Sequence, residues 1–222
     1  MNELSALVIG SSGLIGNFVL EELLKDDQYS KVRILVRRQL KLQHTKLQQE
    51  LVNFDDINDY KSKFGKGDAI FCCVGTTLKK VKGDKIKYIK IDFDIAVNAA
   101  KIGNSAGYPK YLLVSSLGAN SASSNFYLQL KGKTEDAIKQ FPFKDIFIFR
   151  PSLLLGSRNE SRPGEKIMQT IMKGISFLFQ GRMKRYRAIQ AKSVALAMVS
   201  ASKKDTPGIH TLEYEKIMKL II

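Results

Sequence analysis

Residues 4–16 read Leu-Ser-Ala-Leu-Val-Ile-Gly-Ser-Ser-Gly-Leu-Ile-Gly, an apolar run that ends at a turn with three glycines. A short apolar run of this kind is typical of a buried parallel strand. Apolar residues then recur at helical spacing over 14–25. Glycines let a backbone turn sharply and approach a ligand, and the free N–H groups of a helix start favour a pyrophosphate. The spacing therefore predicts a strand, a phosphate-binding turn and a helix, with the glycines at Gly10, Gly13 and Gly16.

The rest of the chain continues to alternate strands with helices. This rhythm predicts an α/β fold, a doubly wound parallel sheet (Rossmann fold) with helices on both faces. We expect a cofactor-binding core over 1–150 and a small C-terminal substrate lobe over 151–222, which adds a last strand and helix to the same structural domain. The predicted strands cover 32–36, 47–54, 68–74, 110–114 and 146–149, and the predicted helices 86–102, 125–139, 165–179, 191–202 and 213–222.

Length and composition exclude several classes of protein. The 222 residues are 44% hydrophobic, enough for one globular domain with a full core. No apolar run approaches the roughly 18 residues that a membrane span needs, and no secretory signal is recognisable. The adjacent Cys72 and Cys73 are interpreted as reduced thiols. We therefore expect a cytoplasmic protein with no membrane contact.

The chain is strongly basic, with 36 Lys and Arg against 21 Asp and Glu and a net charge of +15. Such a surplus favours an anionic partner. No nucleic-acid-binding motif accompanies the basic runs, so a small-molecule substrate is expected rather than a specific nucleic acid. Arg185 and Arg187 lie in the predicted substrate lobe and suggest an anionic substrate. Because His44 and His210 have no Cys, Asp or Glu at ligand spacing, no metal site is expected.

Two strand ends carry further signals for a cofactor. The second predicted strand ends in Arg37-Arg38, and no acidic residue lies between Lys31 and Gln49. An acidic side chain at this point selects NAD, whereas arginine accommodates the 2′-phosphate of NADP. The sequence thus favours NADP(H), although the pair could merely cap a strand. The fourth strand runs into Val74-Gly75, where small residues leave room for ribose and diphosphate.

The fifth predicted strand ends in Ser115-Ser116, and the following helix carries Tyr127 and Lys131. Four residues apart on a helix means one face, so phenol and ammonium can converge. A fixed ammonium group favours the phenolate form and makes a tyrosine a better acid-base catalyst. A serine hydroxyl could then orient a substrate carbonyl or alcohol. This arrangement predicts hydride-transfer chemistry.

Together these features resemble the short-chain dehydrogenase/reductase superfamily. The similarity is greatest to its atypical branch, typified by the Tat-interacting, NADPH-binding oxidoreductase-like proteins. It extends over roughly residues 5–200 and rests on the glycine turn, 37–38, 71–77, 115–116, 124–132, 149–155 and 158–165.

The resemblance implies roles for individual residues. Tyr127 would be the proton donor or acceptor and Ser116 the substrate-orienting serine, with Ser115 as the alternative. An asparagine often completes the site in the wider superfamily; the nearest match here is Asp92, a departure at the point where a proton relay would pass. Ser12, Gly13, Leu14 and Ile15 would hold the diphosphate of the cofactor, and Arg37 and Arg38 would hold its 2′-phosphate. Its ribose and nicotinamide would contact Val74, Gly75, Lys131 and Leu154, and Arg162 would close over it.

Three functions remain open. The leading one is an NADP(H)-dependent oxidoreductase acting on a carbonyl or alcohol through a Tyr-Lys-Ser site. A nucleotide-sugar epimerase or dehydratase shares the glycine spacing, although the lobe after residue 150 is short for a sugar nucleotide. The third is a non-catalytic NADPH-sensing regulator. The apolar segment 213–222 is either core or a subunit contact, so a homodimer stays open.

Overall fold

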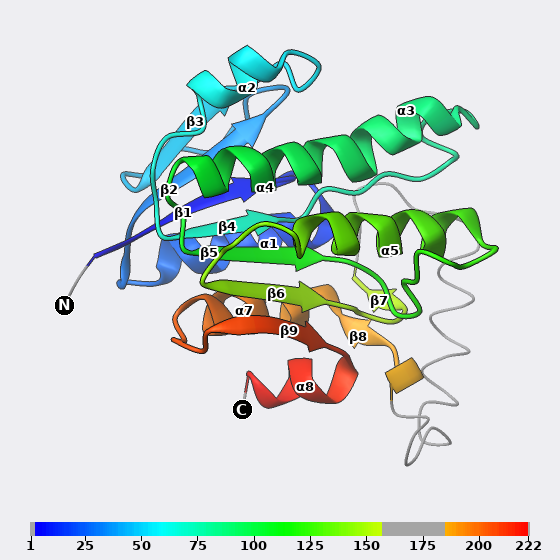
Figure 1. Cartoon of the computed structure of the whole chain (residues 1–222). Helices are drawn as coiled ribbons and strands as arrows, with labels where there is room; N and C mark the ends of the chain where they lie inside the picture. Colours follow the sequence, from blue (N-terminus) through cyan, green and yellow to red (C-terminus); the bar gives the residue numbers. More distant parts are fainter. Residues whose placement is uncertain (1–2, 157–184, 222) are drawn as a thin grey trace.

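A parallel sheet forms the centre of the molecule in the computed structural model, which describes residues 3–156 and 185–221 (Figure 1). In chain order its strands are β1 (Leu4–Ile9), β2 (Tyr29–Val36), β3 (Leu47–Leu51), β4 (Ala69–Cys72), β5 (Lys110–Val114), β6 (Asp145–Phe149) and β9 (Gly208–Leu212). Across the sheet they run β3-β2-β1-β4-β5-β6-β9, all parallel. The order reverses between β1 and β4, where doubly wound sheets bind ligands at the carboxyl ends of their strands.

Helices cover both faces of the sheet (Figure 1). One face packs against α1 (Leu14–Lys25), α7 (Ala191–Ser202) and α8 (Tyr214–Lys219). The other packs against α2 (Ile57–Ser62), α4 (Ile95–Ser105) and α5 (Phe126–Ile138). A short helix α3 (Lys85–Ile89) leads through the π-helical turn η1 (Lys90–Asp94) into α4. A separate parallel pair, β7 (Leu154–Leu155) and β8 (Ile189–Gln190), lies beside the main sheet.

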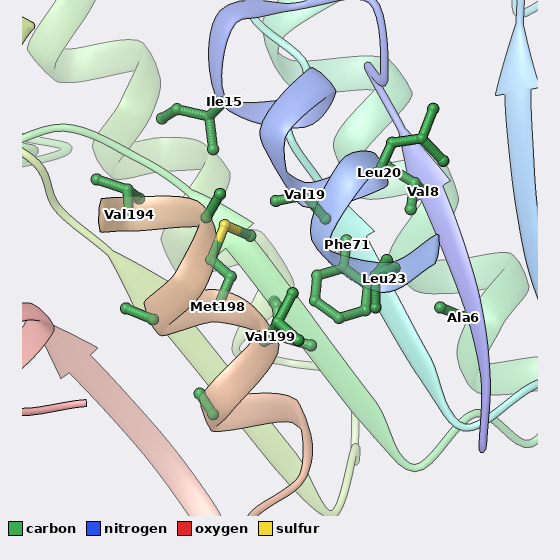
Figure 2. Packing of buried hydrophobic residues seen from close by; sticks show 14 of the residues in the cluster. Ala6, Val8, Ile15, Val19, Leu20, Leu23, Phe71, Val194, Met198 and Val199 are labelled. Carbon is green, nitrogen blue, oxygen red and sulfur yellow. The ribbon is translucent and has the colours of Figure 1, made fainter. Parts of the chain in front are cut away.

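The alternation of apolar side chains along β1 explains the two cores. Ala6 and Val8 point to the α1 and α7 side, whereas Leu7 and Ile9 point to the opposite side, and all four are buried. Figure 2 shows how the first of these cores fills the space between helix and sheet. Phe71 of β4 lies beneath apolar side chains of α1 and α7: Ile15, Val19, Leu20, Leu23, Val194, Met198 and Val199.

The doubly wound parallel fold is confirmed, and four predicted elements have the expected bounds: 4–9, 14–25, 110–114 and 191–202. The predicted strand 47–54 is shorter, because its partner β2 ends at Val36, opposite Leu51. The predicted continuous helix 86–102 is instead interrupted by η1. The last helix covers only 214–219 of the expected 213–222. Sequence reasoning did not anticipate α2, β7 or β8, and the predicted helix 165–179 lies outside the described residues.

Candidate functional site

A cavity of about 450 Å³ opens at the carboxyl ends of β1, β4 and β5, where the strand order reverses. Its wall is built from the turn after β1, the loop after β4, the end of β5, one face of α5 and the start of β7. Ten of the residues singled out from the sequence share this wall: Ser12, Gly13, Leu14, Ile15, Val74, Gly75, Ser115, Tyr127, Lys131 and Leu154.

The glycine turn is shaped by close backbone contacts. Gly10 has φ +85°, and a Cβ added there would lie 2.7 Å from the carbonyl carbon of Cys73. A Cβ on Gly16 would lie 2.1 Å from the Gly10 carbonyl oxygen, so only glycine lets α1 start this close to β1. Gly13 precedes α1 without any side-chain cap. The first N–H groups of α1 thus remain available to an anion in the cavity.

Helix α5 presents Tyr127 and Lys131 to the same cavity. The helix begins where the Asn125 side chain accepts a hydrogen bond from the Leu128 N–H. Tyr127 is 39% exposed, whereas Lys131 is only 6% exposed. The phenol therefore lies near the mouth of the cavity and the ammonium group deeper in its wall.

The buried Lys131 is paired with Asp92, which the π-helical turn η1 brings into the cavity wall. Lys131 Nζ lies 3.1 Å from Asp92 Oδ1, and Asp92 Oδ2 accepts a 2.7 Å hydrogen bond from the Thr76 N–H. Burial by itself lowers the pKa of Lys131, but the charge of Asp92 and a smaller effect of Tyr127 hold that pKa above the ordinary lysine value. The lysine is thus kept protonated despite its burial.

A second charged cluster lies one turn further along α5. Glu135 is fully buried, and its Oε1 accepts hydrogen bonds from Ser115 Oγ at 2.5 Å and from Arg150 Nε at 2.9 Å. Its Oε2 accepts from Arg150 Nη2 at 2.5 Å. The Ser115 proton is therefore directed away from the cavity toward Glu135. Among the described residues, the one contact of the Ser116 hydroxyl is a 3.4 Å hydrogen bond to the Leu117 carbonyl, and Ser116 is not part of the cavity wall.

Other predicted residues lie outside the wall. Arg37 and Arg38 are exposed directly after β2, the neighbour of β1. Arg185 is exposed and stacks on Tyr186, whereas Arg162 lies outside the described residues. Gly10 and Gly16 shape the turn without lining the cavity. In 3–156 and 185–221 no group of three or more side chains could hold a metal ion.

Sequence reasoning missed the partners of the helix α5 side chains. Asp92 was noted only as a departure from the family pattern, and neither Glu135 nor Arg150 was singled out. The signal for Glu135 was its position four residues after Lys131, which places both on one face of a helix. Arg150 follows β6 as Ser115 follows β5, and neighbouring parallel strands end at the same edge of the sheet.

Known proteins match this chain over most of its length. A family model described as NAD(P)H-binding matches residues 10–205. The chain is 36% identical to protein HTATIP2 of Rattus norvegicus over 168 residues, which cover 74% of this chain and 69% of that protein. It is 31% identical over 206 residues to the mitochondrial protein fmp52 of Aspergillus fumigatus, covering 90% of this chain and 88% of the relative.

Solved structures share the fold at low sequence identity. UDP-N-acetylglucosamine 4-epimerase from Methanobrevibacter ruminantium matches with a TM-score of 0.69 and 16% identity, covering 96% of this chain and 77% of the epimerase. Uronate dehydrogenase from Agrobacterium tumefaciens matches with a TM-score of 0.71 and 12% identity, covering 96% and 76%. These likenesses establish a fold that dehydrogenases and epimerases share.

The expectation of a cytoplasmic location is contradicted. The fungal relatives, including those of Meyerozyma guilliermondii and Aspergillus niger, are named mitochondrial proteins. The expectation rested on reduced cysteines and an unremarkable N-terminus, and neither feature specifies a compartment, because thiols persist wherever the surroundings are reducing. In the described part of the chain, no helix has the length and apolar character to cross a bilayer.

The resemblance to the Tat-interacting branch of short-chain dehydrogenases/reductases is confirmed by the relative that is 36% identical. The matched family model covers the glycine turn, the loop after β4, both serines and α5. On these grounds, the chain belongs to the NAD(P)H-binding family.

Proposed function

We propose that the chain is an NADP(H)-dependent oxidoreductase that interconverts a carbonyl compound and its alcohol. The observation that carries this proposal is the meeting of Tyr127 and Lys131 in the wall of the cavity that the glycine turn also lines. A phosphate-binding turn alone would support only cofactor binding. The added phenol and ammonium supply the groups that proton transfer to a substrate oxygen requires.

The cavity fits a dinucleotide. Its floor includes the uncapped start of α1, and side chains at Gly10 and Gly16 would collide with the backbone that forms the turn. Asp92 Oδ1 has an ion-pair partner but no well-aligned hydrogen-bond donor among the described residues. The start of α1 would hold the diphosphate, Arg37 and Arg38 would hold the 2′-phosphate, and Lys131 would hold the nicotinamide ribose.

The bound nicotinamide would supply or accept the hydride. Tyr127 would exchange a proton with the substrate oxygen, since its phenol lies at the partly exposed end of the cavity. The charged Lys131 lies in the same wall, where its ammonium group would attract negative charge that develops on the oxygen atoms during that exchange. Because Lys131 is buried, its charge is screened less by solvent than that of a surface lysine.

The two serines would take different parts. Ser115 donates its only hydroxyl proton to Glu135, so toward the cavity it can act as an acceptor. Orienting a carbonyl oxygen requires a donor. The Ser116 hydroxyl lies outside the cavity wall, and among the described residues its one contact is the long one to Leu117, so it would have to turn toward the cavity to provide a donor. Ser116 is therefore proposed as the substrate-orienting serine and Ser115 as an acceptor in the wall.

The test replaces Tyr127 with Phe and screens ketones and aldehydes with NADPH, following nicotinamide absorbance. Loss of general acid-base catalysis should lower kcat by about 10²- to 10⁴-fold, with NADPH binding retained. Tyr186→Phe, which removes another exposed phenol, is the matched control and should keep full activity. Full activity in Tyr127→Phe would refute the assignment, and binding without turnover in the wild type would favour a regulator that senses NADPH.

A further inference from the structure

Asp92 occupies an unusual place for a carboxylate. It is 2% exposed, lies in the cavity wall and belongs to η1, a π-helical turn between two α-helical segments. Single π turns inside α-helices are rare and recur at functional sites. This turn places a buried acidic side chain beside the Thr76 backbone and Lys131, and at this depth an unpaired charge would be strongly unfavourable.

The two oxygens of Asp92 have different partners from different elements. Oδ2 accepts the Thr76 N–H of the loop after β4, and Oδ1 faces Lys131 Nζ of α5. This loop and α5 form two walls of the proposed cofactor cavity. The Asp92 carboxylate therefore bonds both to the loop backbone that would face the ribose and to the ammonium group that would bind the ribose.

We propose that Asp92 is a positioning residue: it fixes Lys131 in the cavity wall, keeps it charged and couples it to the Gly75–Thr77 loop, so that both meet a bound NADP(H) together. The inference rests on the proposed function for the identity of that ligand. An asparagine could accept the Thr76 N–H equally well, but it could not balance a buried ammonium charge. The carboxylate is therefore required by Lys131 rather than by the loop.

Few titratable groups of the described residues face Lys131 and Asp92. Lys131 is faced by Asp92 from η1, by Tyr127 from its own helix and by the buried Cys72 from β4. Asp92 is also near Tyr88 of α3, whose pKa is raised first by burial and then by the Asp92 charge. Because Asp92 is the nearest anion, the raised pKa of Lys131 depends mainly on it. The stability that the pair contributes is present at neutral pH and is lost as pH rises through that raised pKa.

The experiment titrates lysine ¹³Cε resonances by NMR in the whole protein, with Lys131 assigned by its loss in Lys131→Met. The variants are Asp92→Asn and the matched control Asp94→Asn, an equal charge change at an exposed position of the same π turn. In the wild type and the control, Lys131 should titrate above free lysine. In Asp92→Asn its pKa should fall by about one unit or more, a tenfold change in its dissociation constant.

NADPH affinity gives the second readout. At a pH above the lowered pKa of Lys131, Asp92→Asn should bind NADPH at least about tenfold more weakly than at a pH below it. A residue that only supported the fold would weaken binding equally at every pH. If Asp92→Asn does not fold, Asp92→Glu decides the matter, because restored charge should preserve the high pKa of Lys131.

Two results would overturn the inference: a Lys131 titration unchanged in Asp92→Asn, or one lowered in Asp92→Glu. Failure of the proposed function looks different. If the wild type bound no NAD(P)H, the proposed ligand would be wrong. The lysine titration would still show whether Asp92 sets the charge of Lys131.

Discussion

Helix α5 carries two buried charged clusters, one turn apart, that differ in how completely they are paired. In the first, Glu135 accepts three hydrogen bonds from Ser115 and Arg150, and both of its oxygens are occupied. In the second, and counting only 3–156 and 185–221, Lys131 has one close anion, and its partner Asp92 has one oxygen without a well-aligned donor. The first cluster joins the ends of β5 and β6 to α5, whereas the second borders the cavity.

This difference in pairing suggests that one cluster supports the fold and the other belongs to the binding site. A buried charge is tolerated when it is fully paired, and a saturated network rigidifies what it connects. The Glu135 cluster fits that description, since it holds Ser115, Arg150 and α5 in a fixed relation. The Lys131 ammonium group has three donors and one close anion among the described residues, so it keeps hydrogen-bonding capacity toward the cavity that it lines. We therefore propose that the Lys131 cluster binds the ligand and that the Glu135 cluster supports the fold.

The largest effect should follow removal of the supporting carboxylate. Glu135→Leu leaves the partly buried Arg150 guanidinium group and the buried Ser115 hydroxyl without their acceptor and should lower the free energy of unfolding by about 3 kcal/mol. Urea denaturation measures it. Asp136→Ala, the exposed carboxylate next to it, is the control and should cost far less. Equal losses in the two variants would show that the Glu135 cluster is not the scaffold.

Replacement of each serine by alanine should have a smaller effect and should show which hydroxyl is the hydrogen-bond donor to the substrate. Loss of a hydrogen-bond donor aimed at a reacting oxygen lowers kcat by on the order of 10²-fold or more. We expect that loss in Ser116→Ala. Ser115→Ala should instead lower stability, because Glu135 loses a buried donor. The kcat and the urea midpoint of both variants check this, and a kcat collapse confined to Ser115→Ala would reverse the assignment.

The smallest effect concerns cofactor choice. Arg37→Ala/Arg38→Ala should weaken NADPH binding by about tenfold or more and leave NADH binding nearly unchanged, since only NADPH carries the 2′-phosphate. Lys31→Ala/Lys61→Ala removes two charges elsewhere on the surface and serves as the control. Fluorescence titration with both nucleotides measures the ratio. A parallel loss for NADH and NADPH would mean that the arginines act only through net charge.

The first strand and helix could be predicted to the residue because a glycine turn separates two clear periodicities. The π turn could not, because apolar residues at 89, 93 and 97 suit a continuous helix equally well. The presence of Tyr127 and Lys131 in one cavity wall followed from their spacing on a helix. The partners of Lys131 and Ser115 come from other elements, so local pattern does not reveal them. The sequence therefore left both serines as candidates, and the structure distinguishes them by the Glu135 contact of Ser115 and by the cavity wall, which Ser115 lines and Ser116 does not.

One measurement bears most directly on the division between site and scaffold. NADPH is titrated calorimetrically into the wild type, Lys131→Met and Lys139→Met; Lys139 Nζ lies 3.8 Å from Glu135 and belongs to the supporting cluster. We predict one-to-one binding in the wild type and Lys139→Met and at least about tenfold weaker binding in Lys131→Met. Equal affinity in all three, or no binding to the wild type, would contradict the assignment of the Lys131 cluster to the cofactor.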